Sequence, residues 1–175
     1  VYLDPVWGMN MSRWSIDFYT NSEPMGSVNV GIDANTGEII HYSNWDHYRE
    51  QQNFIAKITR NEALKIAQDF LKSKFNFDMD SFELQKENPY NYMYRVGGVK
   101  ELVQHDFNFV KKHNGIPVMN YMISVTVDGT DGKIRNYYNN SFEIDTSKLP
   151  SAEGILDETQ AMEKYKESVN LVLQY

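Results

Sequence analysis

The chain has 175 residues and a formal net charge of −7, and hydrophobic and charged residues make up 41% and 23% of it. This balance is typical of a folded globular protein, and the acidic charge disfavours a surface that binds nucleic-acid phosphates. Cysteine is absent, which excludes disulfides, thiolate zinc sites and cysteine nucleophiles. Aromatic residues reach 14%, with 12 tyrosines, and this favours β-sheet.

The chain contains no apolar run long enough for a membrane span, so no transmembrane segment is predicted. Its first residues, VYLDPVWG, lack the basic and apolar regions of a signal peptide. Because the first residue is not methionine, we expect a mature or excised segment of a longer protein.

The first predicted strands recur near the other end of the chain. The two copies are SVNVGIDANTGEIIHYSNW (27–45) and MISVTVDGTDGKIRNYYNNSF (122–142). Asp33 and Gly37 correspond to Asp128 and Gly132, 95 residues later (128 − 33). Alternating apolar residues predict strands on either side of each turn, and the glycines predict positive φ at the end of the turn. A further apolar alternation precedes each copy: Trp14, Ile16 and Phe18 in the first, Phe107 and Phe109 in the second.

A predicted helix follows each hairpin. The helices are ITRNEALKIAQDFLKSKF (58–75) and LDETQAMEKYKESVNLVL (156–173), offset by 98 residues (157 − 59). Thr59 with Glu62 predicts a capping box, and Asp157 with Gln160 a looser one. Each helix carries an apolar stripe: Ala63, Ile66, Ala67, Phe70 and Phe75 in the first, and Met162, Tyr165, Val169 and Val172 in the second.

The repeating unit is therefore a helix followed by antiparallel strands, and the chain is out of phase with it. Residues 1–54 are the sheet portion of a first unit, residues 55–144 are a complete second unit, and residues 145–175 are a linker and a helix without a sheet. We expect this last helix to cover the sheet of residues 14–45, within the chain or from a neighbouring chain through an oligomer or a helix swap. The alternative is that each helix packs on the nearest sheet. Residues 88–104 have no clear period and are interpreted as an inserted hairpin or loop.

The order of these motifs identifies a family resemblance. FNFVKKHNGIPVMNYMISVTVDGTDGKI (107–134), the first helix and LPSAEGILDETQAMEKYKESVNLVLQY (149–175) resemble the YcdB/YcdC repeat, which is similar to PepSY domains. The resemblance implies an α+β fold of tandem PepSY-like or cystatin-like units, each a helix packed on an antiparallel β-sheet. It also implies an exported protein at the cell envelope or outside Gram-positive bacteria, with no established catalytic activity and no cofactor. It assigns no site residue to this chain.

Motifs with a defined chemistry are not found. His41 and His47 share a strand face about 20 Å apart, so they are interpreted as surface residues rather than metal ligands. The DGTDG turn (128–132) is interpreted as a hairpin, because it lacks the spacing and the terminal glutamate of a calcium loop. HExxH, GxSxG and glycine-rich phosphate loops are absent from the sequence. We therefore predict no catalytic, metal or cofactor-binding residues.

The aromatic residues carry the one binding hypothesis. A sheet face presenting Tyr90, Tyr92, Tyr94, Tyr42 and Trp45 is a candidate partner-binding surface, and core packing is the alternative for these rings. A free sheet edge could also receive an extended peptide, and Pro117 would protect one edge because it lacks an N–H.

We predict a non-enzymatic exported module that binds a protein partner, with a peptidase as the candidate by analogy with protease propeptides. The alternative is a repeat that binds a cell-wall polymer or carbohydrate through the tyrosine-rich face. An enzyme with a site between units is a third reading.

Overall fold

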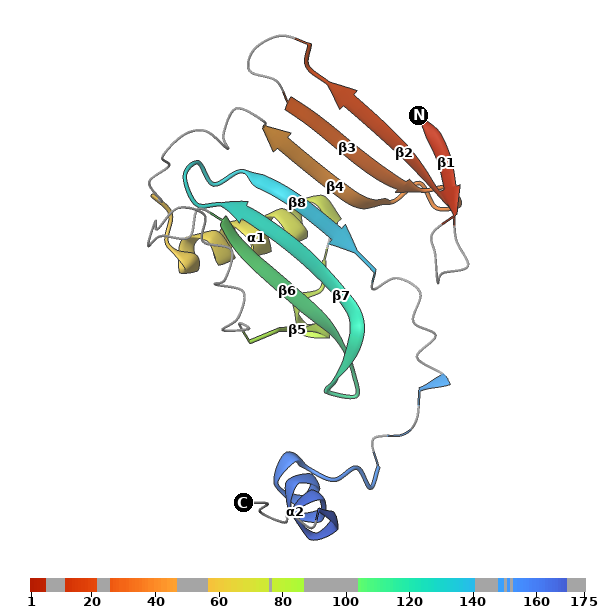
Figure 1. The fold of residues 1–175 in the computed structure, drawn as a ribbon, viewed down its shortest axis with the longest axis vertical. Helices are drawn as coiled ribbons and strands as arrows, with labels where there is room; N and C mark the ends of the chain where they lie inside the picture. Colours follow the sequence, from red (N-terminus) through yellow and green to blue (C-terminus); the bar gives the residue numbers. More distant parts are fainter. Residues whose placement is uncertain are drawn as a thin grey trace, which may run out of the picture. The chain divides into compact units, whose positions relative to one another are not determined.

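The computed structural model describes residues 1–5, 12–21, 26–46, 57–75, 77–86, 104–140, 148–149, 151 and 153–169. Within these ranges the chain forms an antiparallel sheet and two α-helices, which confirms the α+β class (Figure 1). The strands are β1 (Tyr2–Pro5), β2 (Ser12–Tyr19), β3 (Gly26–Asp33), β4 (Ile39–Asp46), β5 (Phe82–Leu84), β6 (Gln104–His113), β7 (Ile116–Asp128) and β8 (Ile134–Asn139). The helices are α1 (Arg60–Phe75), the 3₁₀ turn η2 (Met79–Ser81) and α2 (Glu158–Ser168).

The strands form one sheet in the order β1-β2-β3-β4-β8-β7-β6-β5. Strands β1–β4 and β5–β8 therefore form two sets of consecutive strands, which meet at the antiparallel pair β4–β8. At this pair Tyr42 lies directly opposite Tyr137, its own counterpart 95 residues later (137 − 42). The pairs on either side, His41 with Tyr138 and Ser43 with Asn136, are also counterparts of each other. The two expected sheet portions thus form one continuous sheet with local two-fold symmetry, and residues 1–144 are one compact unit.

Helix α1 packs on one face of the β5–β8 half, against β6 and β7 (Figure 1). Its buried residues Ala63, Ala67 and Leu71 recur at every fourth position and so lie on one side of the helix. They join a core built from the sheet residues Phe107, Phe109, Ile123, Val125, Val127 and Tyr137. The predicted stripe is confirmed, because Ile66, Phe70 and Phe75 pack against this core; Leu71 was missing from the prediction.

The predicted turns have the expected backbone. Gly37 and Gly132 have φ of 76° and 72°, and Asn114 and Gly115 have φ of 51° and 80°. These values lie in the left-handed region that such turns require. Pro117 pairs with Lys112 of β6, in the part of β7 that runs beyond the end of β8, which ends opposite Ile123. The proline therefore lies at an edge, as its missing N–H demands.

Residues 145–175 form a separate unit that contains α2. Asp157 caps this helix: its carboxylate accepts the Gln160 N–H at 2.8 Å, and the Gln160 side chain accepts the Asp157 N–H at 3.1 Å. The predicted capping box is thus confirmed. The helix ends at Ser168, and the predicted continuation to 173 extends into residues outside those described. That α2 covers residues 14–45 remains a prediction. None of the described helices has the length and apolar character needed to cross a membrane.

Candidate functional site

The apolar face of the β1–β4 half is the most prominent exposed feature of the sheet. We define the open face as Trp14, Ile16, Phe18, Val28, Val30 and Ile32. Cross-strand pairing places them together, because Trp14 lies opposite Ile32, Ile16 opposite Val30 and Phe18 opposite Val28. Val30 in turn lies opposite Tyr42, and Tyr42 opposite Tyr137. The open face is therefore on the same side of the sheet as α1.

Burial differs sharply between the open face and its counterpart under α1. By register, Trp14 corresponds to His105, and Phe18 to Phe109. Trp14 and Phe18 are 43% and 58% exposed, whereas His105 and Phe109 are 6% and 1% exposed. Fully covering one such aromatic side chain contributes about 1.5–3 kcal/mol. Apolar groups gathered and partly exposed on one sheet face make it a candidate interaction surface.

The segment that leads into α1 shows how a helix is fixed to this type of sheet. The N–H groups of Lys57 and Ile58 both donate to the Gly129 carbonyl, at 2.7 and 2.9 Å. The His105 Nε2 lies 2.9 Å from the Ile58 carbonyl, which makes it the donor of that hydrogen bond. A Cβ on Gly132 would lie only 2.9 Å from Ile58 Cδ1, so the bare glycine lets the segment approach the turn.

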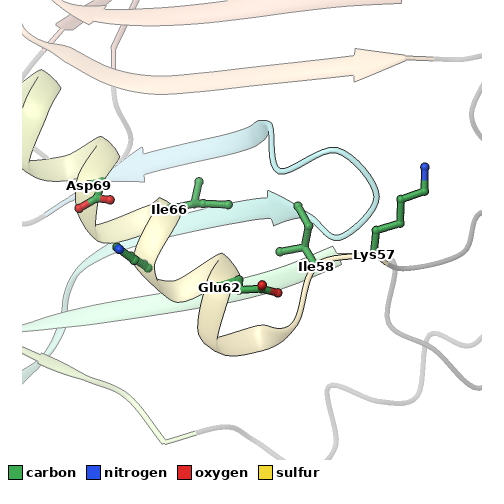
Figure 2. Close-up of a pocket in the computed structure, with 6 residues that line it drawn as sticks. Lys57, Ile58, Glu62, Ile66 and Asp69 are labelled. Carbon is green, nitrogen blue, oxygen red and sulfur yellow. The ribbon is translucent and has the colours of Figure 1, made fainter.

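A surface depression runs along α1 and is drawn in Figure 2. It is lined by Lys57, Ile58, Glu62, Lys65, Ile66 and Asp69. Figure 2 shows that Lys57 extends away from the helix, so its amine does not converge with the acidic groups. Hydrogen bonds from the Thr59 N–H and hydroxyl lower the pKa of Glu62, because its carboxylate closes the helix cap. In this depression the Glu62 carboxylate is thus held by the helix cap.

The opposite face of the sheet is polar, and its side chains pair across strands. Side-chain hydrogen bonds of 2.6–2.7 Å join Asp17 to Asn29, Asn108 to Ser124, and Asp106 to Thr126. Burial lowers the pKa of His41 on this face, and the nearby Arg13 lowers it further. The neutral imidazole is thus favoured, and its ring packs edge-on against Tyr138 at 6.2 Å.

The DGTDG segment is a hairpin turn held by its own side chains, as predicted. The Asp128 carboxylate accepts the Thr130 N–H at 2.8 Å and Arg135 Nε at 2.9 Å. Arg135 also reaches Asp131 at 3.1 Å. The Arg135 guanidinium therefore pairs with both carboxylates of the turn. Within the described ranges no cluster of three or more histidine or acidic residues is arranged to hold a metal.

The predicted aromatic site residues do not all come together. Tyr42 is partly buried and packs against the core, on the side of the sheet that bears α1. Trp45 is 45% exposed, and because it is three positions further along β4 it points to the polar face. Tyr90, Tyr92, Tyr94 and His47 lie outside the described residues.

Sequence reasoning recognised the alternation of Trp14, Ile16 and Phe18 but assigned no binding role to it. The signal was present in the alternation itself, which matches that of Phe107 and Phe109 in the second copy. What the sequence lacked was the β4–β8 pairing, which puts the open face and α1 on the same side.

The architecture is α+β, with an antiparallel sheet and two α-helices among the described residues. A family model described as the YcdB, YcdC repeated domain matches residues 6–141. The chain therefore belongs to this family of repeated domains, as its motifs indicated. Among solved structures, the Bacillus megaterium YpeB C-terminal domain is similar, with 15% sequence identity, a TM-score of 0.41, and coverage of 94% of this chain and 68% of that one. The curated proteins contain no match.

Proposed function

We propose that the chain is a non-catalytic module of an exported protein that holds a protein partner by adding an extended segment of it to β1. The observation that carries this proposal is the position of β1 at one end of the sheet order. Its residues Tyr2 and Leu3 are 48% and 52% exposed, and the preceding Val1 is 82% exposed. An edge strand offers main-chain N–H and C=O groups to an incoming strand, and neighbouring apolar side chains add affinity.

A peptidase is the proposed partner class, and the support for it is the similarity of YcdB/YcdC repeats to PepSY domains, which also occur in protease propeptides. Pairing of a peptidase segment with β1 would hold that segment, or would block the substrate cleft of the peptidase, without covalent chemistry. This is consistent with a family of repeated domains.

The test is the rate of a thermolysin-type peptidase on a small peptide substrate as the chain is added. We expect the rate to fall. Successive N–H groups of a strand point to opposite sides, so one of the N–H groups of Tyr2 and Leu3 points away from β2. The proline variant at that position lacks this N–H and should relieve inhibition. The alanine variants at the same positions keep the N–H and serve as controls. An unchanged rate at saturating chain contradicts a peptidase partner; equal inhibition by all variants contradicts edge binding.

A second candidate is binding of a cell-wall polymer or other carbohydrate through aromatic side chains. Tyr19 and Trp45, 71% and 45% exposed, lie on the polar face on either side of Ser27. Two strand spacings separate them by about 10 Å, which suits two stacked sugar rings beside polar groups. In sedimentation with peptidoglycan, Trp45→Ala should reduce binding, and Trp14→Ala on the other face should not. Equal sedimentation of both variants with the wild type contradicts this candidate.

A further inference from the structure

The attachment of α1 to the β5–β8 half uses three positions of the sheet. They are the Gly129 carbonyl, which accepts two N–H groups, the His105 ring, which donates to Ile58, and Gly132, whose bare backbone receives the Ile58 and Ile66 side chains. Figure 2 shows Ile58 and Ile66 on the side of the helix that faces the β7 and β8 strands. The three positions form a receptor for an amphipathic helix and the two residues that precede its cap.

The β1–β4 half has a counterpart at each position. Ala34 stands where the second copy has Gly129, and Gly37 where it has Gly132 (129 − 34 = 132 − 37). Trp14 takes the place of His105, because it lies opposite Ile32 as His105 lies opposite Val127. The indole N–H is a donor, as His105 Nε2 is. A Cβ at Gly37 would meet nothing within 4 Å, whereas one at Gly132 would meet isoleucine. The receptor is thus repeated, and the space over it is open in the described structure.

The segment around α2 has the features of the segment around α1. At the offset of 98 residues, Ile155 and Leu156 correspond to Lys57 and Ile58. The three helix positions buried in α1 correspond to Ala161, Tyr165 and Val169, again at every fourth position. Both helices begin with a capping box. Within its own unit α2 buries no residue, and Ile155, Leu156 and Tyr165 are 57%, 40% and 62% exposed. The segment carries an apolar stripe that its own unit does not bury.

We propose that residues 155–169 dock on the open face of the same chain as residues 57–71 dock on the covered face. The N–H groups of Ile155 and Leu156 donate to the Ala34 carbonyl, and the Trp14 indole donates to the Leu156 carbonyl. Leu156 then lies over Gly37, and Tyr165 packs on the open face. This inference concerns a different surface from β1 and does not depend on the proposed function.

The connection is long enough for docking within one chain. Fifteen residues lead from Asn140 to Ile155 (155 − 140), and an extended chain of that length reaches about 50 Å. The farthest strand of the open half lies four strand spacings from β8, about 19 Å. A second copy of the chain is therefore not required to supply the helix.

The absence of cysteine allows a direct test by disulfide trapping in the full chain. Residues joined by a backbone hydrogen bond have Cα atoms about 5–6 Å apart, within the range of a disulfide. The pair Ala34→Cys with Ile155→Cys should form a disulfide within one chain under mild oxidation, seen by non-reducing electrophoresis and peptide mass spectrometry. The matched control is Ser27→Cys with Ile155→Cys, since Ser27 is at the other end of β3, about 23 Å away.

A disulfide between two chains would overturn docking within one chain and assign the helix to a second copy. Trapping no faster than in the control would overturn the docking site. Amide hydrogen exchange gives an independent readout without new cysteines. An isolated 11-residue helix is marginal in water, so docked α2 amides should exchange at least about tenfold more slowly than in Leu156→Asp/Tyr165→Asp. Equal α2 exchange in both proteins, with β7 amides as the internal reference, would also overturn it.

Discussion

Replacing Gly132 by alanine tests the contact between the β7–β8 turn and the segment that precedes α1. Gly132 has φ of 72°, and an added Cβ would lie 2.9 Å from Ile58 Cδ1 and 3.2 Å from Ile66 Cδ1. A non-glycine residue in this conformation costs about 1–2 kcal/mol, and overpacking adds about 1–3 kcal/mol. Gly115→Ala is the control, because its φ is 80° and a Cβ there would meet nothing within 4 Å.

The free energy of unfolding, from urea titration followed by circular dichroism, should fall more for Gly132→Ala than for Gly115→Ala. For a chain of this length, each kcal/mol lowers Tm by roughly 2–4 °C. Ile58→Val removes the Cδ1 atom in the closest contact, and alone it costs about 0.5–1.5 kcal/mol. In the double variant, Ile58→Val should recover part of the stability that Gly132→Ala loses. The double-mutant cycle should therefore give a coupling free energy of about 0.5 kcal/mol or more. Equal losses for both glycines, together with strict additivity, would refute the steric argument.

Three further predictions concern ionisation and capping. Burial raises the pKa of Tyr137 to about 12, so the neutral side chain stabilises the fold fully below pH 10. Roughly 2–3 kcal/mol of the free energy of unfolding is lost as the pH rises from 10 to 12. In Tyr137→Phe, the urea midpoint should fall less over this pH range than in the wild type. Burial and then Arg13 lower the pKa of His41, so stability present above pH 6.5 should decline as the pH falls below it, and an equally steep decline in His41→Gln would contradict this. Thr59→Ala should cost about 1 kcal/mol in unfolding free energy and Thr59→Ser much less; similar losses for both would show that the cap hydroxyl is not stabilising.

Much of the fold is local and could be predicted from the sequence. Alternation of apolar residues gave β2, β3, β6 and β7, since a half-buried strand must place every second side chain on the core. The glycines at 37 and 132 marked turns, because positive φ is costly for other residues. Both capping boxes formed where the polar residues were spaced to satisfy the first N–H groups of a helix.

The pairing of β4 with β8 could not be predicted in the same way. The local sequence of either strand does not determine its pairing partner, because edge strands of similar pattern present equivalent N–H and C=O groups. The strand pairing also decided which of Tyr42 and Trp45 lies on the core face. Alternation along one strand assigns opposite faces to them, but the identity of the core face depends on where α1 packs.

The local two-fold at Tyr42 and Tyr137 has a consequence for function. Because directly opposed residues share a face, this symmetry places both halves of the apolar surface on one side of the sheet. The two halves then differ in coverage: α1 packs on one half, whereas Trp14 and Phe18 are exposed on the other among the described residues. The side chains also differ in kind, since the half without α1 has Trp14 in place of His105, a larger apolar group that keeps a donor. A surface that had lost its helix through drift would not be expected to retain both the donor and the unobstructed glycine at 37. Their joint presence supports the proposed docking of a helix on the open face.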